Sequence, residues 1–284
     1  MSAPATTGSP TRPDPPSPGR LPGTLRLGLS RGWLEIRTFS REWEGVLFTF
    51  VLPSVVLTLF ATVMGDLFDM GVPAVDYFLP GLIAMGLMSV SFQTLGVSIA
   101  TEREYGMLRR LRGTPMPPGA YFVGKTILVL FLALGQVVLL LTVARLFFGA
   151  TLPSTVEAWA TIAWVFVLGT VACSLLGIAV SSLARTPQAA SVVVTFPFLI
   201  LQFISGIFVP VMALPEWLLN LASLFPLLWM AQGMRAAFFP EAMAALEPSG
   251  SWELPTVAPA LGIWCVVGLA VTLTTFRWKT RKDG

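Results

Sequence analysis

The stretch from Thr126 to Ala144 reads TILVLFLALGQVVLLLTVA and contains no charged residue. Roughly 18 uncharged apolar residues, rising about 1.5 Å each as a helix, are enough to cross the hydrocarbon of a bilayer. The whole chain shares this character, because 55% of its 284 residues are hydrophobic and only 12% are charged. An ordinary soluble domain carries roughly 25% charged residues. The sequence therefore predicts an all-α integral membrane protein.

Similar apolar runs lie on both sides of this stretch. Together they predict six transmembrane helices, at about 45–64, 77–100, 119–148, 156–183, 189–209 and 256–276. An even number of spans places both ends of the chain on the same side of the membrane. We therefore expect one six-span transmembrane domain over residues 45–276.

The distribution of charge predicts the orientation, because short cytoplasmic loops retain Lys and Arg. With the N-terminus inside, every Lys and Arg except Arg145 and Arg235 falls on the inner side. The acidic residues that then fall outside are Asp66, Asp69, Asp76, Glu157, Glu216, Glu241, Glu247 and Glu253. The sequence therefore predicts that the N- and C-termini are cytoplasmic.

The two ends of the chain differ from the apolar centre. Residues 1–23 are dominated by Pro, Ser, Thr and Gly, which favours a disordered tail, and residues 277–284 form a basic cytoplasmic tail. Over 24–44, apolar residues recur at helical spacing between four arginines, which predicts an amphipathic interfacial helix. The apolar positions are Leu25, Leu29, Trp33, Ile36 and Trp43, and the arginines are Arg26, Arg31, Arg37 and Arg41.

The segment between the fifth and sixth runs stays apolar but is broken by prolines at 210, 215 and 226. Proline interrupts helices, so we expect a partly inserted extracytoplasmic helical segment before the last span. In the fourth run, small residues recur four apart, which predicts close approach of another helix, with a role in a transport path as the alternative. They are Gly169, Cys173, Gly177 and Ser181.

Several classes of function are disfavoured by composition. The chain has no histidine, and Cys173 and Cys265 lie in separate apolar runs, so we expect no metal site and no disulfide. A net charge of +3 is too small to suggest nucleic acid as a partner.

The longest inner loop, residues 101–115, reads TEREYGMLRRLRGTP. Thr101 and Glu104 have the spacing of a capping box, and Gly113 with Pro115 supplies a stop, so we expect one short helix. Its apolar positions, Tyr105, Leu108 and Leu111, share one face, while arginines occupy the rest. We interpret that face as an edge that docks into a groove on another protein.

The chain resembles the type-2 ABC exporter permeases, and within them the daunorubicin and antibiotic-resistance exporters. The run Glu102–Pro115 follows the family pattern E-R-E-x-G-x-L-x-x-L-x-x-T-P, and Gly124-Lys125 follows at the family's distance. A later pattern is matched by Ser205, Gly206, Pro210, Leu214, Pro215, Trp217, Pro226, Trp229 and Arg235. Many members carry Thr-Leu-Glu where this chain has Met107-Leu108-Arg109, so the resemblance does not show which charge pairs with the partner.

The resemblance implies a transport subunit of the bacterial cytoplasmic (inner) membrane that works beside an ABC ATPase subunit. ATP and magnesium would be bound by that partner, and a second permease copy or a sister permease would complete the assembly. The loop at 101–115 would be the coupling helix that seats in the ATPase. The coupling residues implied are Glu102, Arg103, Glu104, Gly106, Leu108, Leu111, Thr114 and Pro115.

Residues 119–126, GAYFVGKT, match the phosphate-binding pattern G-x-x-x-x-G-K-T. A true P-loop joins a buried strand to a helix in a soluble domain, whereas here Met116-Pro117-Pro118 precedes the match and an apolar span follows. We therefore expect no nucleotide at this position and no enzyme activity in this chain. Lys125 is expected to snorkel to the inner headgroups.

No ionisable residue falls at the middle of a predicted span, so we expect the energy for transport to come from outside the membrane. The neutral polar residues at mid-membrane include Gln93, Gln136 and Gln202, which are candidates for a substrate path or for hydrogen bonds between helices. A path with few polar groups favours a small hydrophobic or amphiphilic cargo, such as a drug, an antibiotic or a lipid-like compound, in contact with membrane lipid.

Three alternatives stay open at this point. A permease for lipid-linked glycans or another envelope polymer would share the fold. A membrane-embedded enzyme would need clustered acids, His or Cys, whereas the outer acids are scattered over three loops. A non-transporting scaffold would keep its function without the coupling helix.

Overall fold

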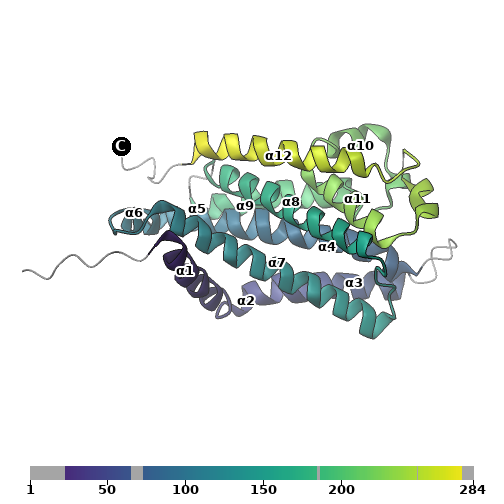
Figure 1. Ribbon diagram of the computed structural model, residues 1–284, viewed down its shortest axis with the longest axis horizontal. Coiled ribbons are helices and arrows are strands. Elements are labelled where there is room, and N and C mark those ends of the chain that lie inside the picture. Colours follow the sequence, from purple (N-terminus) through teal and green to yellow (C-terminus); the bar gives the residue numbers. More distant parts are fainter. Residues whose placement is uncertain (1–22, 65–72, 184–185, 248, 277–284) are drawn as a thin grey trace, which may run out of the picture.

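The computed structural model describes residues 23–64, 73–183, 186–247 and 249–276, and every regular element in these ranges is a helix. The prediction of an all-α fold is therefore confirmed. Most of both predicted tails, 1–23 and 277–284, lies outside the described residues. Figure 1 shows the long helices lying side by side in one bundle.

The chain contains sixteen helical elements in the described residues, of which several join end to end. In order they are α1 (Thr24–Phe39), α2 (Trp43–Val46), η1 (Leu47–Val51), α3 (Leu52–Val63), α4 (Ala74–Met88), η2 (Ser89–Thr94), α5 (Leu95–Glu104), α6 (Met107–Arg112), α7 (Pro118–Phe148), α8 (Val156–Ser181), α9 (Pro187–Ile204), η3 (Val211–Ala213), α10 (Glu216–Ala222), α11 (Pro226–Phe238), η4 (Glu241–Leu246) and α12 (Leu254–Thr275).

Within the described residues, five helices are long and apolar enough to cross a membrane. They are Trp43–Val63, Ala74–Glu104, α7, α8 and α12. The run predicted at 189–209 forms α9, whose apolar part, Ser191–Ile204, is shorter than these five. It ends early because Ser205 leaves the helix and Gly206 turns the chain with a left-handed φ of 72°. The count of six spans therefore stays a prediction.

Helix α4 is the centre of the bundle, and it packs against α3, α7, α8 and α11. Almost all of its side chains are buried, including Phe78, Leu82 and Leu87. A helix that is apolar on every face is covered on every face, which explains why this segment has so little amphipathic pattern. The helices around α4 have large apolar side chains exposed on their outer faces, as expected where lipid rather than water is the neighbour.

The small residues of α8 bring other helices close, as their spacing predicts. A Cβ atom added at Gly177 would lie 2.6 Å from the carbonyl oxygen of Phe92 in η2, and one at Gly169 would lie 2.7 Å from the Met230 side chain in α11. The Cys173 thiol lies 3.6 Å from the Met230 sulfur. The packing interpretation is confirmed for these positions.

Two of the spans contain a π-helical segment. Residues Leu47–Val51 form η1 in the first span, and Ser89–Thr94 form η2 in the second. The π-helix is rare, and single turns of it inside α-helices are frequent at functional sites. Both segments contribute side chains to the same groove, described below.

Helix α1 packs on α7 through glycines. A Cβ atom at Gly28 would lie 2.5 Å from Val123, and one at Gly32 would lie 2.7 Å from Ile127. The opposite face leaves Leu25, Leu29 and Trp33 more than half exposed. An exposed apolar face of this kind is what an interfacial helix needs, and its position at the headgroups remains a prediction.

The proline-broken segment folds into short helices at the end of the bundle opposite α6 (Figure 1). Pro210, Pro215 and Pro226 stand at the starts of η3, α10 and α11, where their missing N–H groups leave no helical hydrogen bond unmade. Helix α11 is largely buried, with Leu227, Met230 and Met234 fully covered. Insertion of this segment into the membrane stays a prediction.

Candidate coupling site

The helix of the inner loop is shorter than predicted. Helix α5 continues through Thr101 to Glu104, so the expected start at Thr101 with a Thr101–Glu104 capping box is wrong. The helix of the second span continues beyond its apolar residues, because the backbone groups of residues 101–104 make hydrogen bonds within the same helix. Tyr105 and Gly106 then form the turn, Gly106 has a φ of 70°, and α6 begins at Met107.

Helix α6 turns its apolar edge toward its own protein. The Leu108 side chain is 0% exposed and Leu111 is partly buried against the same core, so the expectation that this edge docks on another protein is wrong for Leu108. A short helix at the end of a bundle covers the core below it, because leaving Leu108 in water would forgo roughly 1.5–3 kcal/mol. The outward surface is made instead by Tyr105, Met107, Arg109, Arg110, Gly113, Thr114 and Pro115.

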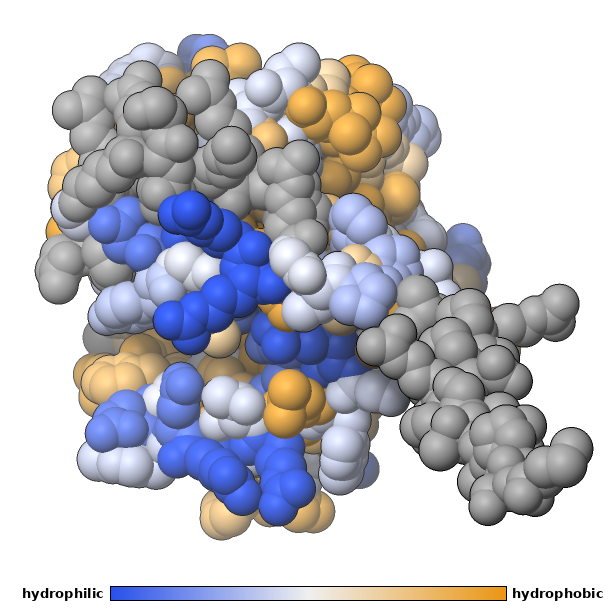
Figure 2. Space-filling view, turned by 90° about the vertical axis from the view of Figure 1, so that its left-hand side faces the viewer, coloured by the Kyte–Doolittle hydropathy of each residue, from blue (hydrophilic) through white to orange (hydrophobic). Residues whose placement is uncertain are grey.

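This end of the molecule is hydrophilic. Figure 2 views the bundle from the α6 end and shows hydrophilic residues gathered between apolar flanks. Arg109 and Arg110 of α6 are exposed, as are Arg26 and Arg37 of α1. The last residues of α12 also lie at this end (Figure 1). Short cytoplasmic loops of membrane proteins are typically basic, and the cytoplasmic orientation of this end stays a prediction.

A buried cluster of charges lies directly beneath α6. The Nζ atom of Lys125 lies 2.6 Å from Glu102 Oε1, 3.0 Å from Glu35 Oε2 and 2.8 Å from Ser98 Oγ. The hydroxyl of Tyr121 donates to Glu102 Oε2 at 2.8 Å. Arg31 lies 2.7 Å from Glu35 and 3.7 Å from Glu102. We call these residues, from α1, α5 and α7, the charge cluster.

The prediction that Lys125 snorkels to the headgroups is wrong, because its side chain is only 3% exposed and points into the charge cluster. The surrounding match to the phosphate-binding pattern lies in the first turns of α7, so Gly119 and Gly124 are helical rather than part of a loop. Gly124 serves packing: a Cβ atom there would lie 2.6 Å from the Arg31 side chain. The glycine and the lysine of this pattern thus both serve the contact with α1.

Arg103 makes a second link beneath α6. Its guanidinium donates to the carbonyl oxygen of Ser181 at 2.6 Å, which is one of the last carbonyls of α8. Unpaired carbonyls at a helix C-terminus favour a cation there. Glu102 and Arg103 are therefore both buried and both hold neighbouring helices, and neither faces outward as a coupling contact.

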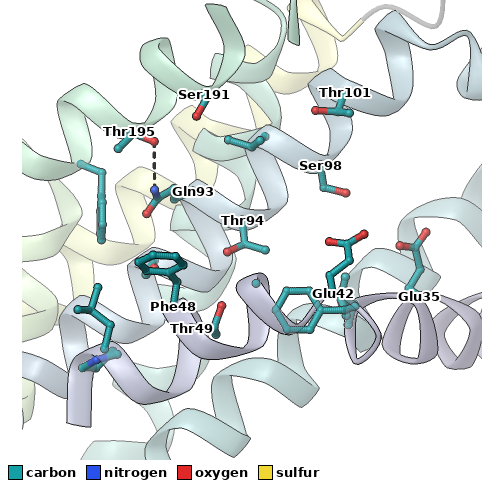
Figure 3. A pocket seen from close by; sticks show the side chains of 18 of the residues that line it. Glu35, Glu42, Phe48, Thr49, Gln93, Thr94, Ser98, Thr101, Ser191 and Thr195 are labelled. Carbon is teal, nitrogen blue, oxygen red and sulfur yellow. Dashed lines mark hydrogen bonds between the residues drawn. The ribbon is translucent and has the colours of Figure 1, made fainter. Parts of the chain in front are cut away.

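Two of the three candidate path residues lie in one groove. Gln93 and Gln202 line a cavity of about 660 Å³ between the first span, α5 and α9, which Figure 3 shows from close by. Gln93 also donates a hydrogen bond to Thr195 of α9 at 3.0 Å. We call this cavity the inner groove, because it reaches from the charge cluster toward the middle of the bundle.

Gln136 is not part of the inner groove. Its amide is 2% exposed and packs on Gly86, where a Cβ atom would lie 2.1 Å from the amide nitrogen. Neither amide atom has a hydrogen-bond partner among the described residues. The structure therefore separates Gln136 from the other two, and a contact between helices describes its position better than a path.

An ion pair at the opposite end was not foreseen from the sequence. Arg235 Nε lies 2.6 Å from Glu247 Oε1, and both side chains are about 5% exposed or less. Arg235 also approaches the carbonyl oxygen of Gly206. The sequence did contain one indication of this pair: Arg235 is an isolated arginine among the outer acidic residues. A lone cation in an apolar segment needs a carboxylate partner. The pair ties α11 to the loop before α12.

The sequence of this chain is similar to those of known membrane transport proteins. Residues 29–239 match the family model described as ABC-2 type transporter. The inner membrane transport permease YadH of Escherichia coli K12 is 28% identical over 214 residues, which are 72% of this chain and 79% of YadH. The probable multidrug ABC transporter permease YbhR of the same organism is 26% identical over 197 residues, 67% of this chain and 52% of YbhR.

Proposed function

Because this chain belongs to the ABC-2 type transporter family and is a membrane-embedded permease, we propose that it exports a hydrophobic or amphiphilic compound outward across the cytoplasmic membrane. The family implies an ABC ATPase as its partner. The proposal adds the orientation, the direction of transport, the cargo class and the surface that meets the ATPase. It also adds a second copy, or a sister permease, as the other half of the membrane unit.

One observation supports α6 as the coupling surface: this exposed basic helix lies beside buried contacts that join α5 to α7 and α8. Helix α6 offers Arg109 and Arg110 to a partner. Directly beneath it, Glu102 binds Lys125 of α7, and Arg103 binds the end of α8. Buried charged contacts hold one geometry, because breaking either partner leaves an unpaired charge. A push on α6 is therefore transmitted to α5, α7 and α8 together.

These links suggest how energy from ATP reaches the membrane. Closure of two ATPase subunits on ATP would press on the exposed surface of α6. Helices α5 and α7 would follow, and α1 would move with them, since Gly28 and Gly32 hold it against α7. The walls of the inner groove include residues of η1 and α9 as well as residues of the moving helices. A movement of α5, α7 and α1 would therefore change the width of the groove.

The size of the inner groove favours a small cargo over a polymer. Sites for drug-sized molecules measure roughly 300–1,000 Å³, and the groove has a volume of about 660 Å³. Its walls are mostly apolar, with hydroxyl and amide groups between them. The similarity to YbhR, which is named a probable multidrug ABC transporter permease, also favours a small cargo. A lipid-linked glycan permease is the second candidate, and it would need a wider passage between two copies.

The test is co-purification with candidate ATPase subunits in native-like membranes. Reversing the charge of Arg109 and Arg110 to Glu should abolish ATPase binding and stimulated ATP turnover. Arg37→Glu, on the exposed face of α1, is the matched control and should leave both intact. Unchanged binding in the Arg109/Arg110 variant would show that α6 is not the coupling surface. Accumulation of candidate drugs or lipid-linked glycans in inverted vesicles then identifies the cargo class.

A further inference from the structure

The inner groove combines aromatic and polar side chains in an ordered way. Phe39, Phe48 and Phe198 contribute apolar surface, while Thr49 and Gln93 bring a hydroxyl and an amide between them (Figure 3). Thr49 comes from η1, and Gln93 and Thr94 come from η2, which are the two π-helical segments. Polar side chains of α9, Thr195 and Gln202, line the opposite wall. Because a π-turn redirects side chains that an α-helix would aim elsewhere, both segments add functional side chains to the same cavity.

In the part of the chain that the structure describes, the charged residues that line the groove are all carboxylates: Glu35, Glu42 and Glu102. Two of them are already neutralised, since Lys125 lies against both Glu35 and Glu102. Glu42 has no Lys or Arg within ion-pair distance among the described residues. Figure 3 shows its carboxylate directed from the turn after α1 toward the helix that carries Ser98. Among the described residues, the groove therefore has one carboxylate without an ion-pair partner, at its solvent-exposed mouth, where Glu42 lies.

We propose that the inner groove is a binding site for an amphiphilic cation, a molecule with a flat apolar body and an amine or other fixed positive charge. The apolar body lies against Phe48 and Phe198, and the charge lies near Glu42. The inference rests on the proposed function, in which this molecule is the exported cargo. It adds the sign of the cargo's charge and the side chain that recognises it.

Charge complementarity argues against the other occupants. An anionic lipid or drug would bring its negative group toward Glu42 and find no lysine or arginine among the described residues of the groove wall. A neutral hydrocarbon would make no ion pair with Glu42 and no hydrogen bond with the polar side chains of the wall, of which Gln93 already donates to Thr195. A cation can satisfy Glu42 while its apolar body displaces lipid, and it is drawn to the mouth by the carboxylate before it binds.

The test uses the purified chain in phosphatidylcholine nanodiscs, which carry no net lipid charge. The probes are rhodamine 6G, which has a net positive charge, and rhodamine B, which has the same cationic ring system but also a free carboxylate and is therefore a net-neutral zwitterion. Binding is followed by fluorescence anisotropy. Wild type should bind rhodamine 6G more tightly than rhodamine B. Glu42→Gln should weaken the binding of rhodamine 6G by about threefold to fivefold, as expected for one partly solvated ion pair, and weaken the binding of rhodamine B by less.

Two further variants sharpen the result. Glu44→Gln removes an exposed carboxylate two residues away that does not line the groove, so it should leave the affinity for rhodamine 6G within about the error of the assay. Phe48→Ala should weaken both dyes, because it removes shared apolar contact. Far-UV circular dichroism and size-exclusion profiles confirm that each variant remains folded.

Four outcomes would overturn the proposal. Equal effects of Glu42→Gln and Glu44→Gln would show general surface attraction rather than a site. Equal affinity of wild type for the two dyes would show a neutral or lipid-like occupant. Unchanged binding in Phe48→Ala would place the dyes elsewhere. If wild type binds neither dye, and Phe48→Ala elutes from size exclusion as a smaller species than wild type, the groove is an interface between copies of the chain.

The proposed function is tested separately from this site. Glu42→Gln should keep its binding to the ATPase subunit, because Glu42 is not on α6. If the wild type binds no ATPase but discriminates the two dyes, the coupling proposal fails and the groove assignment stands. If ATPase binding is normal and the dyes are not discriminated, the groove assignment alone fails.

Discussion

The Nζ atom of Lys125 lies 2.6 Å from the Oε1 atom of Glu102, which joins α7 to α5 directly beneath α6. Their side chains are only 3% and 12% exposed. The same ammonium reaches Glu35 of α1 at 3.0 Å. One lysine thus connects three helices at the end of the bundle that carries the proposed ATPase surface.

Replacing Lys125 with Met is expected to destabilise the folded protein by about 3 kcal/mol, because it leaves Glu102 and Glu35 buried with less positive charge. The double variant Lys125→Met with Glu102→Gln should recover part of this loss. Thermal unfolding of the purified chains, followed by intrinsic fluorescence, measures both effects. Arg37→Met, at an exposed position of α1, is the control and should unfold like wild type. An unaltered transition in Lys125→Met would contradict the role given to the cluster.

Substitutions in α6 and in the turn before it should separate folding from coupling. Leu108→Asp places a charge where the side chain is 0% exposed, so we expect a loss of folded protein rather than a selective loss of ATPase binding. Tyr105→Ala, at a side chain that is 65% exposed, should keep the fold and weaken ATPase binding. Size-exclusion chromatography and co-purification distinguish the two. A well-folded Leu108→Asp protein would place this leucine on the surface instead.

Two glycines in long helices make a matched pair. A Cβ atom at Gly177 would lie 2.6 Å from a backbone oxygen of η2, whereas one at Gly262 in α12 would meet nothing within 4 Å. Gly177→Ala is therefore expected to lower stability by roughly 1–3 kcal/mol through forced displacement of η2, and to reduce transport. Gly262→Ala should be neutral or slightly stabilising. Thermal unfolding and vesicle transport check both, and equal behaviour would argue against tight contact at η2.

The turn before α6 depends on one backbone conformation. Gly106 has a φ of 70°, and an added Cβ atom would meet nothing within 4 Å, so strain is the main cost of a side chain there. Gly106→Ala should lower the free energy of unfolding by about 1–2 kcal/mol. Gly106→Asn should lower it by less, because asparagine tolerates the left-handed region. We expect ATPase stimulation to fall in the same order. If Ala and Asn behave alike, the turn does not set the position of α6.

The apolar runs predicted the long helices well, because length and hydropathy are local properties that a bilayer selects directly. The span predicted at 119–148 is α7, Pro118–Phe148, and the one at 156–183 is α8, Val156–Ser181. The inner loop was predicted less well. Capping residues at Thr101 and Glu104 suggested a helix start, but the helix of the second span already supplied those backbone groups with partners.

The sequence by itself determined that the protein is a helical membrane protein, and its motif indicated the family, because both depend on residue type and spacing along the chain. Only the tertiary structure decided what Lys125 does. Read in sequence, it belongs to a phosphate-like pattern or to the headgroups; in the fold, it sits among carboxylates from two distant segments. Burying an ammonium requires such partners, and which carboxylates come within reach is set by helix packing, which no local pattern specifies.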